Sequence, residues 1–262
     1  MRWLKQGCCN SLSTRKQYTI DVWGTILFLD ISDSKLGVEA LDAAVKKVED
    51  FVFDVDRDFS TYKTNSFVSR LRRDEIGIDE CPPDVVEVWN QCAVAGELTM
   101  GAFNPWAVDG GFDPSGYVKG WASDRCAQIL IDAGVEDIQI NAAGDITLRG
   151  PKKSVGVVNP ENRKEIVKIF ELQDCAIATS GDYEKGGHIR DPFTGTVAIG
   201  AASATVIGPD GGLADALATA LMVAGEDGSD WFSNPELSEY SAWVIERHTG
   251  QNWGVGPQFF TA

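Results

Sequence analysis

The sequence lacks the patterns that membrane proteins and secreted proteins need. It has no apolar run of about 18 residues, which a membrane-spanning helix requires. Residues 1–17 include basic side chains but no apolar core of the length found in secretion signals. We therefore expect no membrane insertion and a cytoplasmic location.

Cysteine, histidine and positive charge are also scarce. The 6 cysteines form no Cys-x-x-Cys pair and only 2 histidines occur, so we expect neither disulfides nor a zinc site. The 23 lysines and arginines are outnumbered by 39 acidic residues, which gives a net charge of −16. Such a charge repels nucleic acid, so no nucleic-acid partner is expected. A phosphate-bearing ligand would need local cations, and a divalent metal could supply them.

The periodicity of apolar residues predicts helices separated from strands. Helices are expected at residues 36–55, 82–100, 115–134 and 212–224. The second starts with Pro-Pro-Asp and the third stops near Gly134, as helices commonly do.

Strands are expected in three regions that are rich in β-branched and apolar residues. Residues 17–30 predict a strand pair or one long strand bent at Gly24, residues 136–205 a mostly antiparallel meander, and residues 240–246 a last strand. Because helices and strands are segregated, the expected class is α+β, with mostly antiparallel sheets packed against helices. No linker divides the chain, so we expect a flexible tail at 1–16 and a single domain of two lobes at 17–262.

The segment ADALATAL, residues 214–221, holds the first candidate site. On a helix, Asp215 and Thr219 lie four residues apart and share one face. A carboxylate and a hydroxyl that converge in this way suit Mg²⁺, which prefers hard oxygen ligands. Asp215 could instead cap the helix or favour its dipole from the first turn. The spacing alone leaves both interpretations open.

Two loops add further candidates. KGGHIRDPFTGT, residues 185–196, has the turn-forming residues of a shaped loop, and its His188 could be a general base or a hydrogen-bonded bystander. The glycine-rich residues 101–125 lead through Lys119 into a helix and could cradle phosphate, although they match neither a Walker loop nor a GxGxxG fingerprint. Two Gly-Asp pairs, at residues 144–145 and 181–182, are interpreted as tight turns.

In this order, the segments resemble the ApbE family of FAD:protein FMN transferases. The resemblance extends from about Trp23 to Gly225 through eight motifs: WGT, FSTYKTNSFVSRL, GAFNP, GYVKGWASD, NAAGDI, TSGDY, HIRDPFTG and ADALATAL. It implies an ApbE-like (T-fold-like) enzyme that uses Mg²⁺ to move the FMN half of FAD onto a Thr or Ser hydroxyl of an acceptor protein, releasing AMP. The acceptor would carry an Asp-x-x-Ser/Thr-x-Ala-Thr motif.

The resemblance also implies roles for individual residues. Asp215, Thr219 and the backbone carbonyl of Ala122 would bind the metal, and His188 is the candidate base. The side of the site that binds FAD would be lined by Trp23, Tyr62, Ala102, Phe103, Asn104, Lys119, Asp124 and Ile189.

Three positions depart from the family pattern and leave two alternatives. Asn104 stands where the family has aspartate, Trp23 where it has methionine, and Ala143 where it has glycine. One alternative is a protein that binds FAD, or hydrolyses it to FMN and AMP, without a protein acceptor. The other is a non-catalytic interaction protein that keeps only the scaffold.

Overall fold

An eight-stranded antiparallel sheet forms the centre of the protein in a computed structural model that describes residues 15–32, 35–181 and 189–259. Its strand order is β1-β2-β3-β4-β7-β8-β9-β10, and each neighbouring pair is antiparallel. The strands are β1 Lys16–Val22, β2 Thr25–Ser32, β3 Asp137–Ala142, β4 Asp145–Arg149, β7 Ala176–Gly181, β8 Ala201–Gly208, β9 Ser241–Glu246 and β10 Asn252–Val255. This sheet confirms the predicted α+β class.

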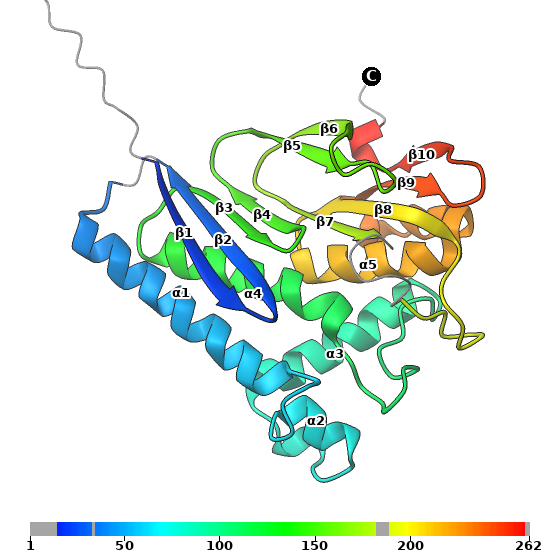
Figure 1. The fold of residues 1–262 in the computed structure, drawn as a ribbon, viewed down its shortest axis with the longest axis horizontal. Helices are drawn as coiled ribbons and strands as arrows, with labels where there is room; N and C mark the ends of the chain where they lie inside the picture. The colour runs from blue at the N-terminus through cyan, green and yellow to red at the C-terminus, as the bar shows by residue number, and fades with distance from the viewer. Residues whose placement is uncertain (1–14, 33–34, 182–188, 260–262) are drawn as a thin grey trace, which may run out of the picture.

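The helices cover one face of this sheet (Figure 1). Helices α4 and α5 contact the sheet directly, α4 against β3 and β4 and α5 against β7 and β8, while α1 packs on α4. The helices are α1 Val38–Phe59, α2 Phe67–Arg72, α3 Pro83–Leu98, α4 Ser115–Asp132 and α5 Gly211–Ala224. No helix in the described ranges has both the length and the apolar composition to cross a membrane.

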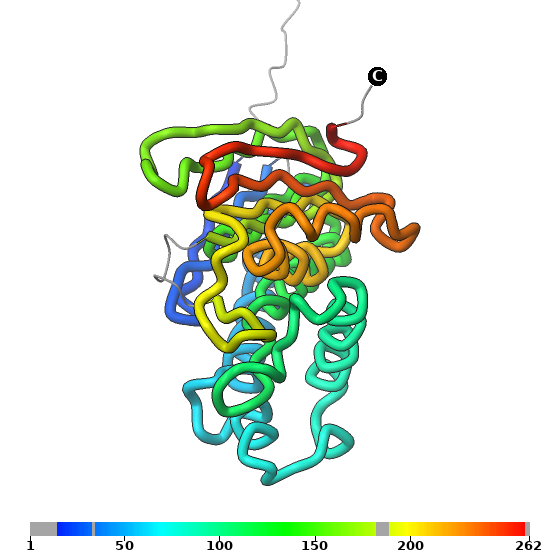
Figure 2. Tube along the Cα trace, turned by 90° about the vertical axis from the view of Figure 1, so that its right-hand side faces the viewer, coloured from blue at the N-terminus to red at the C-terminus, as the bar shows by residue number. Residues whose placement is uncertain are grey.

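Part of the opposite face, over β4, β7, β8 and β9, is covered by a separate hairpin, β5 Lys153–Val158 and β6 Ile166–Leu172 (Figure 2). Its inward residues Val155, Val157 and Phe170 pack with Ile177 and Ile207 of the main sheet. The predicted meander over 136–205 is therefore corrected: β4 pairs directly with β7, and the hairpin between them forms its own two-stranded sheet.

The remaining elements lie close to their predicted positions, with some additions. The segment at 17–30 is the hairpin β1–β2, which turns at Trp23 and Gly24, and β9 matches the last predicted strand. Helix α2 and strand β10 were not predicted. Of the predicted tail 1–16, residues 1–14 lie outside the described residues, whereas Lys16 already belongs to β1.

Three glycines allow α4 and α5 to cross with their backbones in contact. A Cβ atom added to Gly120 of α4 would lie 2.0 Å from the carbonyl oxygen of Gly211, and one added to Gly212 would lie 2.6 Å from the ring of Tyr117. Only residues without a side chain fit such a crossing. The crossing brings the first turns of α4 beside α5, where the candidate site is found.

Candidate active site

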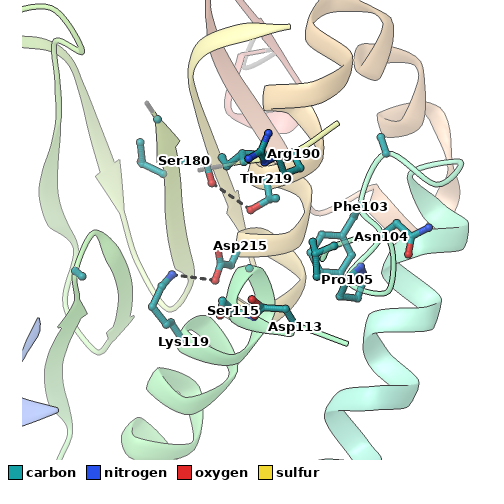
Figure 3. A pocket seen from close by; sticks show the side chains of 17 residues that line it. Phe103, Asn104, Pro105, Asp113, Ser115, Lys119, Ser180, Arg190, Asp215 and Thr219 are labelled. Atoms are coloured by element: carbon teal, nitrogen blue, oxygen red, sulfur yellow. Dashed lines mark hydrogen bonds and ion pairs between the residues drawn. The ribbon is translucent and has the colours of Figure 1, made fainter. Parts of the chain in front are cut away.

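A cleft opens beside the crossing of α4 and α5. It is lined by the first turns of α4, the inner face of α5, the end of β7, the 102–113 loop, the β3–β4 turn and residues 189–190 (Figure 3). Lys119, Asp215 and Thr219 all line it. The structure thus brings together residues of two motifs, GYVKGWASD and ADALATAL, that are far apart in the sequence.

Asp215 and Thr219 lie on the cleft side of α5, one helical turn apart. The Thr219 hydroxyl is 3.3 Å from the Ser180 hydroxyl of β7. The helix is capped by Asp210, whose Oδ1 accepts a hydrogen bond of 2.7 Å from the Leu213 amide. Because Asp210 fills that role, the interpretation of Asp215 as the helix cap is wrong. The side chain of Asp215, which is 5% exposed, instead faces a lysine.

That lysine, Lys119, lies between two carboxylates. Its Nζ is 2.5 Å from Oδ2 of Asp145 and 3.2 Å from Oδ2 of Asp215. Burial disfavours the ammonium, but the two carboxylates outweigh burial and hold the pKa of Lys119 above its usual value. Lys119 is therefore a permanent cation in the cleft at neutral pH.

The sequence did not reveal the part played by Asp145. This residue opens β4 directly after the turn Ala143–Gly144, and only 4% of it is exposed. Burial raises the pKa of its carboxyl, while Lys119 acts in the opposite direction. The alternation of side chains along a strand could have drawn attention to this residue. Asp145 and Thr147 are two residues apart, so both side chains point to the helix-facing side of β4, where apolar residues are usual.

The 102–113 loop forms a second wall of the cleft. Ala102 and Phe103 line it and are 5% and 4% exposed. Asn104 also lines it, and its exposed side chain accepts, through Oδ1, a 3.1 Å hydrogen bond from the Trp106 amide. Trp106 packs on Trp89 with ring centroids 5.0 Å apart, which anchors the loop on α3.

The third wall comes from the segment after residue 188. Ile189 and Arg190 line the cleft, and Arg190 was not predicted although it lies in the HIRDP motif. A tight turn follows, in which the Asp191 amide donates to the Thr196 carbonyl at 2.8 Å. The candidate base His188 lies outside the described residues and immediately precedes Ile189.

Two predicted FAD contacts and one predicted metal ligand do not line this cleft. Tyr62 is 95% exposed in the loop after α1, and Trp23 forms the β1–β2 turn with a φ of 57°. Ala122 is fully buried in α4, about one turn beyond Lys119 and away from the cleft.

Asp124 does not line the cleft either, and its carboxylate has three partners elsewhere. The Gly211 amide donates to it at 2.6 Å, the Thr147 hydroxyl at 2.8 Å and the Arg149 guanidinium at 3.2 Å. Burial raises the pKa of Asp124, and these donors oppose the rise. Asp124 thereby ties α4, β4 and the start of α5 together.

A sequence model of the ApbE family matches residues 108–242, just over half of the chain. The chain belongs to the ApbE family. The matched range contains Lys119, Asp145, Asp215 and Thr219, and Ala102 to Asn104 precede it.

Two curated relatives carry the name FAD:protein FMN transferase. Those of Vibrio cholerae and Rhodobacter capsulatus are each 36% identical to this ApbE-family chain, over 130 and 131 residues. These matches cover 44% and 45% of the chain, but 39% and 25% of the relatives. The chain therefore spans about two fifths or less of the length of the curated relatives it matches.

Solved structures share the fold over most of the chain. The flavin transferase ApbE of Vibrio cholerae superposes with a TM-score of 0.79 at 21% identity and covers 94% of this chain and 98% of its own. The apo flavinyl transferase ApbE of Pseudomonas stutzeri gives 0.78 at 21% identity, covering 94% and 96%.

Proposed function

We propose that this chain uses Mg²⁺ to transfer the FMN half of FAD to a Thr or Ser hydroxyl of an acceptor protein, with release of AMP. The observation that carries the proposal is the placement of Asp215 and Thr219 in one cleft with the cation Lys119. Family membership and the names of the curated relatives support it. The expected acceptor carries an Asp-x-x-Ser/Thr-x-Ala-Thr motif.

The donors in the cleft fit magnesium rather than zinc. Asp215 and Thr219 offer hard oxygen atoms, and no three His, Cys, Asp or Glu side chains cluster within the described part of the chain. Magnesium commonly takes one or two carboxylates and completes its shell with water and substrate phosphate. The residues therefore suit a metal that is bound together with a phosphate-bearing ligand.

A third protein ligand is better supplied by the start of α4 than by Ala122. Gly116 lines the cleft, and its φ of −87° and ψ of 17° break the helical geometry there. A Cβ atom at Gly116 would lie 3.0 Å from the Thr219 hydroxyl, so this backbone runs close beside the proposed site. We therefore assign the backbone ligand to the turn at 115–116.

The other walls of the cleft suit the pyrophosphate and the flavin ring of FAD. Arg190 adds positive charge, which would oppose the repulsion between a pyrophosphate and the acidic protein. The Lys119 ammonium is balanced by its two carboxylates but would still offer a hydrogen-bond donor to a pyrophosphate oxygen. Ala102, Phe103 and Ile189 offer an apolar surface to the flavin ring. Asn104 adds a polar group without the charge of the family's aspartate.

The reaction is a displacement at phosphorus. The acceptor hydroxyl oxygen forms a bond to the phosphorus of the FMN half, the phosphoanhydride bond breaks, and AMP leaves with the bridging oxygen. The hydroxyl proton passes to a base, for which His188 is our candidate. When bound, Mg²⁺ neutralises charge on the pyrophosphate oxygens. Water in place of the hydroxyl would give FMN and AMP.

The test is incubation with FAD, MgCl₂ and an acceptor protein that carries the motif. In-gel flavin fluorescence measures the labelled acceptor, and chromatography measures AMP. We expect equal amounts of both products from the unmodified chain and none in EDTA. Asp215→Asn should lower the rate on the order of 100-fold or more, because metal stabilisation of charge contributes several kcal/mol.

Asp227→Asn is the matched control, since Asp227 is exposed after α5 and does not line the cleft. It should leave the rate unchanged. Release of AMP without a labelled acceptor would mean that the chain hydrolyses FAD and does not transfer FMN. Absence of both products, or full activity in Asp215→Asn, would refute the proposal.

A further inference from the structure

Three charged side chains meet at the back of the cleft. Lys119 and Asp215 line it, whereas Asp145 lies behind Lys119 and does not. The ammonium is nearer to Asp145, at 2.5 Å, than to Asp215, at 3.2 Å. Both aspartate side chains are nearly buried, at 5% exposure each, so their charges are weakly screened. The three groups together carry one net negative charge.

We propose that Asp145 is a positioning residue that neutralises Lys119, so that Asp215 keeps the negative charge by which the cleft binds a divalent cation. This inference rests on the proposed function, because it takes Asp215 as a metal ligand. Without Asp145, the ammonium would have Asp215 as its remaining ion-pair partner within the described residues. Lysine would then compete with the metal for the same carboxylate.

The position of Asp145 in the sheet fits this task. The side chain projects from the first residue of β4, and its backbone is fixed by pairing with Ala142 across the two-residue turn. A strand end held in this way gives the carboxylate a defined place against α4. Residues that contact a metal ligand or its neighbours, rather than the metal, normally orient the ligand in this way. Their loss lowers metal affinity by roughly 10–100-fold.

Charge counting separates this role from a merely structural one. Asp145→Asn keeps the shape and one oxygen acceptor but makes the three-residue group neutral, so the cation should bind more weakly. Lys119→Met raises the net negative charge to two. The double variant Lys119→Met/Asp145→Asn returns the net charge to minus one, as in the unmodified chain, although it removes both members of the pair.

The experiment measures metal binding without FAD. Mn²⁺ is titrated into the full chain and followed by electron paramagnetic resonance, and Mg²⁺ is used to displace it. Asp145→Asn should weaken binding by roughly 10–100-fold, and the double variant should recover to within about threefold of the unmodified chain. Asp137→Asn, which removes the carboxylate of the Lys153 ion pair far from the cleft, should change nothing. Circular dichroism checks that each variant is folded.

The outcomes are distinct. Unchanged binding in Asp145→Asn would overturn the inference and leave the proposed function standing. Weak binding in both Asp145→Asn and the double variant would overturn it too, because structural damage would not be repaired by charge. If the unmodified chain bound no divalent metal, the proposed metal site would be refuted, and the inference with it.

Discussion

Alanine in place of Gly120 should destabilise the protein, although glycine-to-alanine changes inside helices normally stabilise it. The usual gain is about 0.5–1 kcal/mol, because glycine loses more backbone freedom on folding. At this crossing, however, the new Cβ would lie 2.0 Å from the Gly211 carbonyl oxygen and 2.9 Å from the Gly212 amide nitrogen. Since comfortable contacts need roughly 3.5 Å, α4 and α5 must separate on the order of 1 Å.

Such overpacking costs about 1–3 kcal/mol, so we expect Gly120→Ala to lower the free energy of unfolding by about 2 kcal/mol. The separation also moves the turn at Gly116 in α4 away from Thr219 in α5, so the proposed metal ligands spread apart and Mn²⁺ affinity should fall as well. Urea unfolding followed by circular dichroism gives the stability.

Gly96→Ala in α3 is the matched control, because its Cβ would lie 3.3 Å from the Phe103 carbonyl oxygen, so that a shift of a few tenths of an ångström relieves the contact. The free energy of unfolding of this variant should stay within about 0.5 kcal/mol of that of the unmodified chain. If Gly120→Ala proved as stable as this control, the close crossing of α4 and α5 would be refuted.

Three further predictions concern turns and buried charges. Ala143→Gly should raise the free energy of unfolding by up to about 1 kcal/mol, because Ala143 has a φ of 56° that strains an L-residue. A lower midpoint of urea unfolding in this variant would contradict the prediction. Asp124→Ala should lower the free energy of unfolding by about 2 kcal/mol, since the Gly211 amide and two side-chain donors lose their acceptor. Unchanged stability together with weaker FAD binding would instead favour the predicted contact between Asp124 and FAD. Asp30→Asn should destabilise at pH 7, and this effect should begin to decline below about pH 4. The hydrogen bonds from Arg15 lower the pKa of Asp30, so its contribution is fully present above the unfolded pKa and is lost as the pH falls through the lower folded pKa. Melting temperatures from pH 3 to 7 test this, and salt should reduce the difference because the Arg15 side chain is 63% exposed.

Local signals were sufficient to predict most of the fold. Helices such as α3 and α4 have apolar spacing and end signals that depend on neighbouring residues alone, and they begin and end within about two residues of their predicted limits. The pairing of β4 with β7 could not be predicted in this way, because it depends on which strands meet across the β5–β6 hairpin. Strand β10 has four residues, one of them Gly254, and so gave little signal.

The candidate site was predicted best where two residues share one helix. Asp215 and Thr219 needed only the helical repeat to converge. The same repeat could have separated Asp124 from Lys119, because five residues place side chains about 140° apart around a helix. The placement of Arg190 at the cleft and the pairing of Asp145 with Lys119 required the three-dimensional structure, since each joins segments that are far apart in the sequence.

Buried aspartates in this protein have two different physical roles. Asp124 accepts from a backbone amide and two fixed side chains, so removing it leaves donors unsatisfied, as expected of a structural group. Asp215 instead pairs with a lysine at the wall of a cleft. Buried ion pairs contribute little net stability, because the desolvation of both charges offsets their attraction. Stability alone therefore does not account for the charged group of Lys119, Asp145 and Asp215, whereas the proposed binding of a cation and a phosphate would.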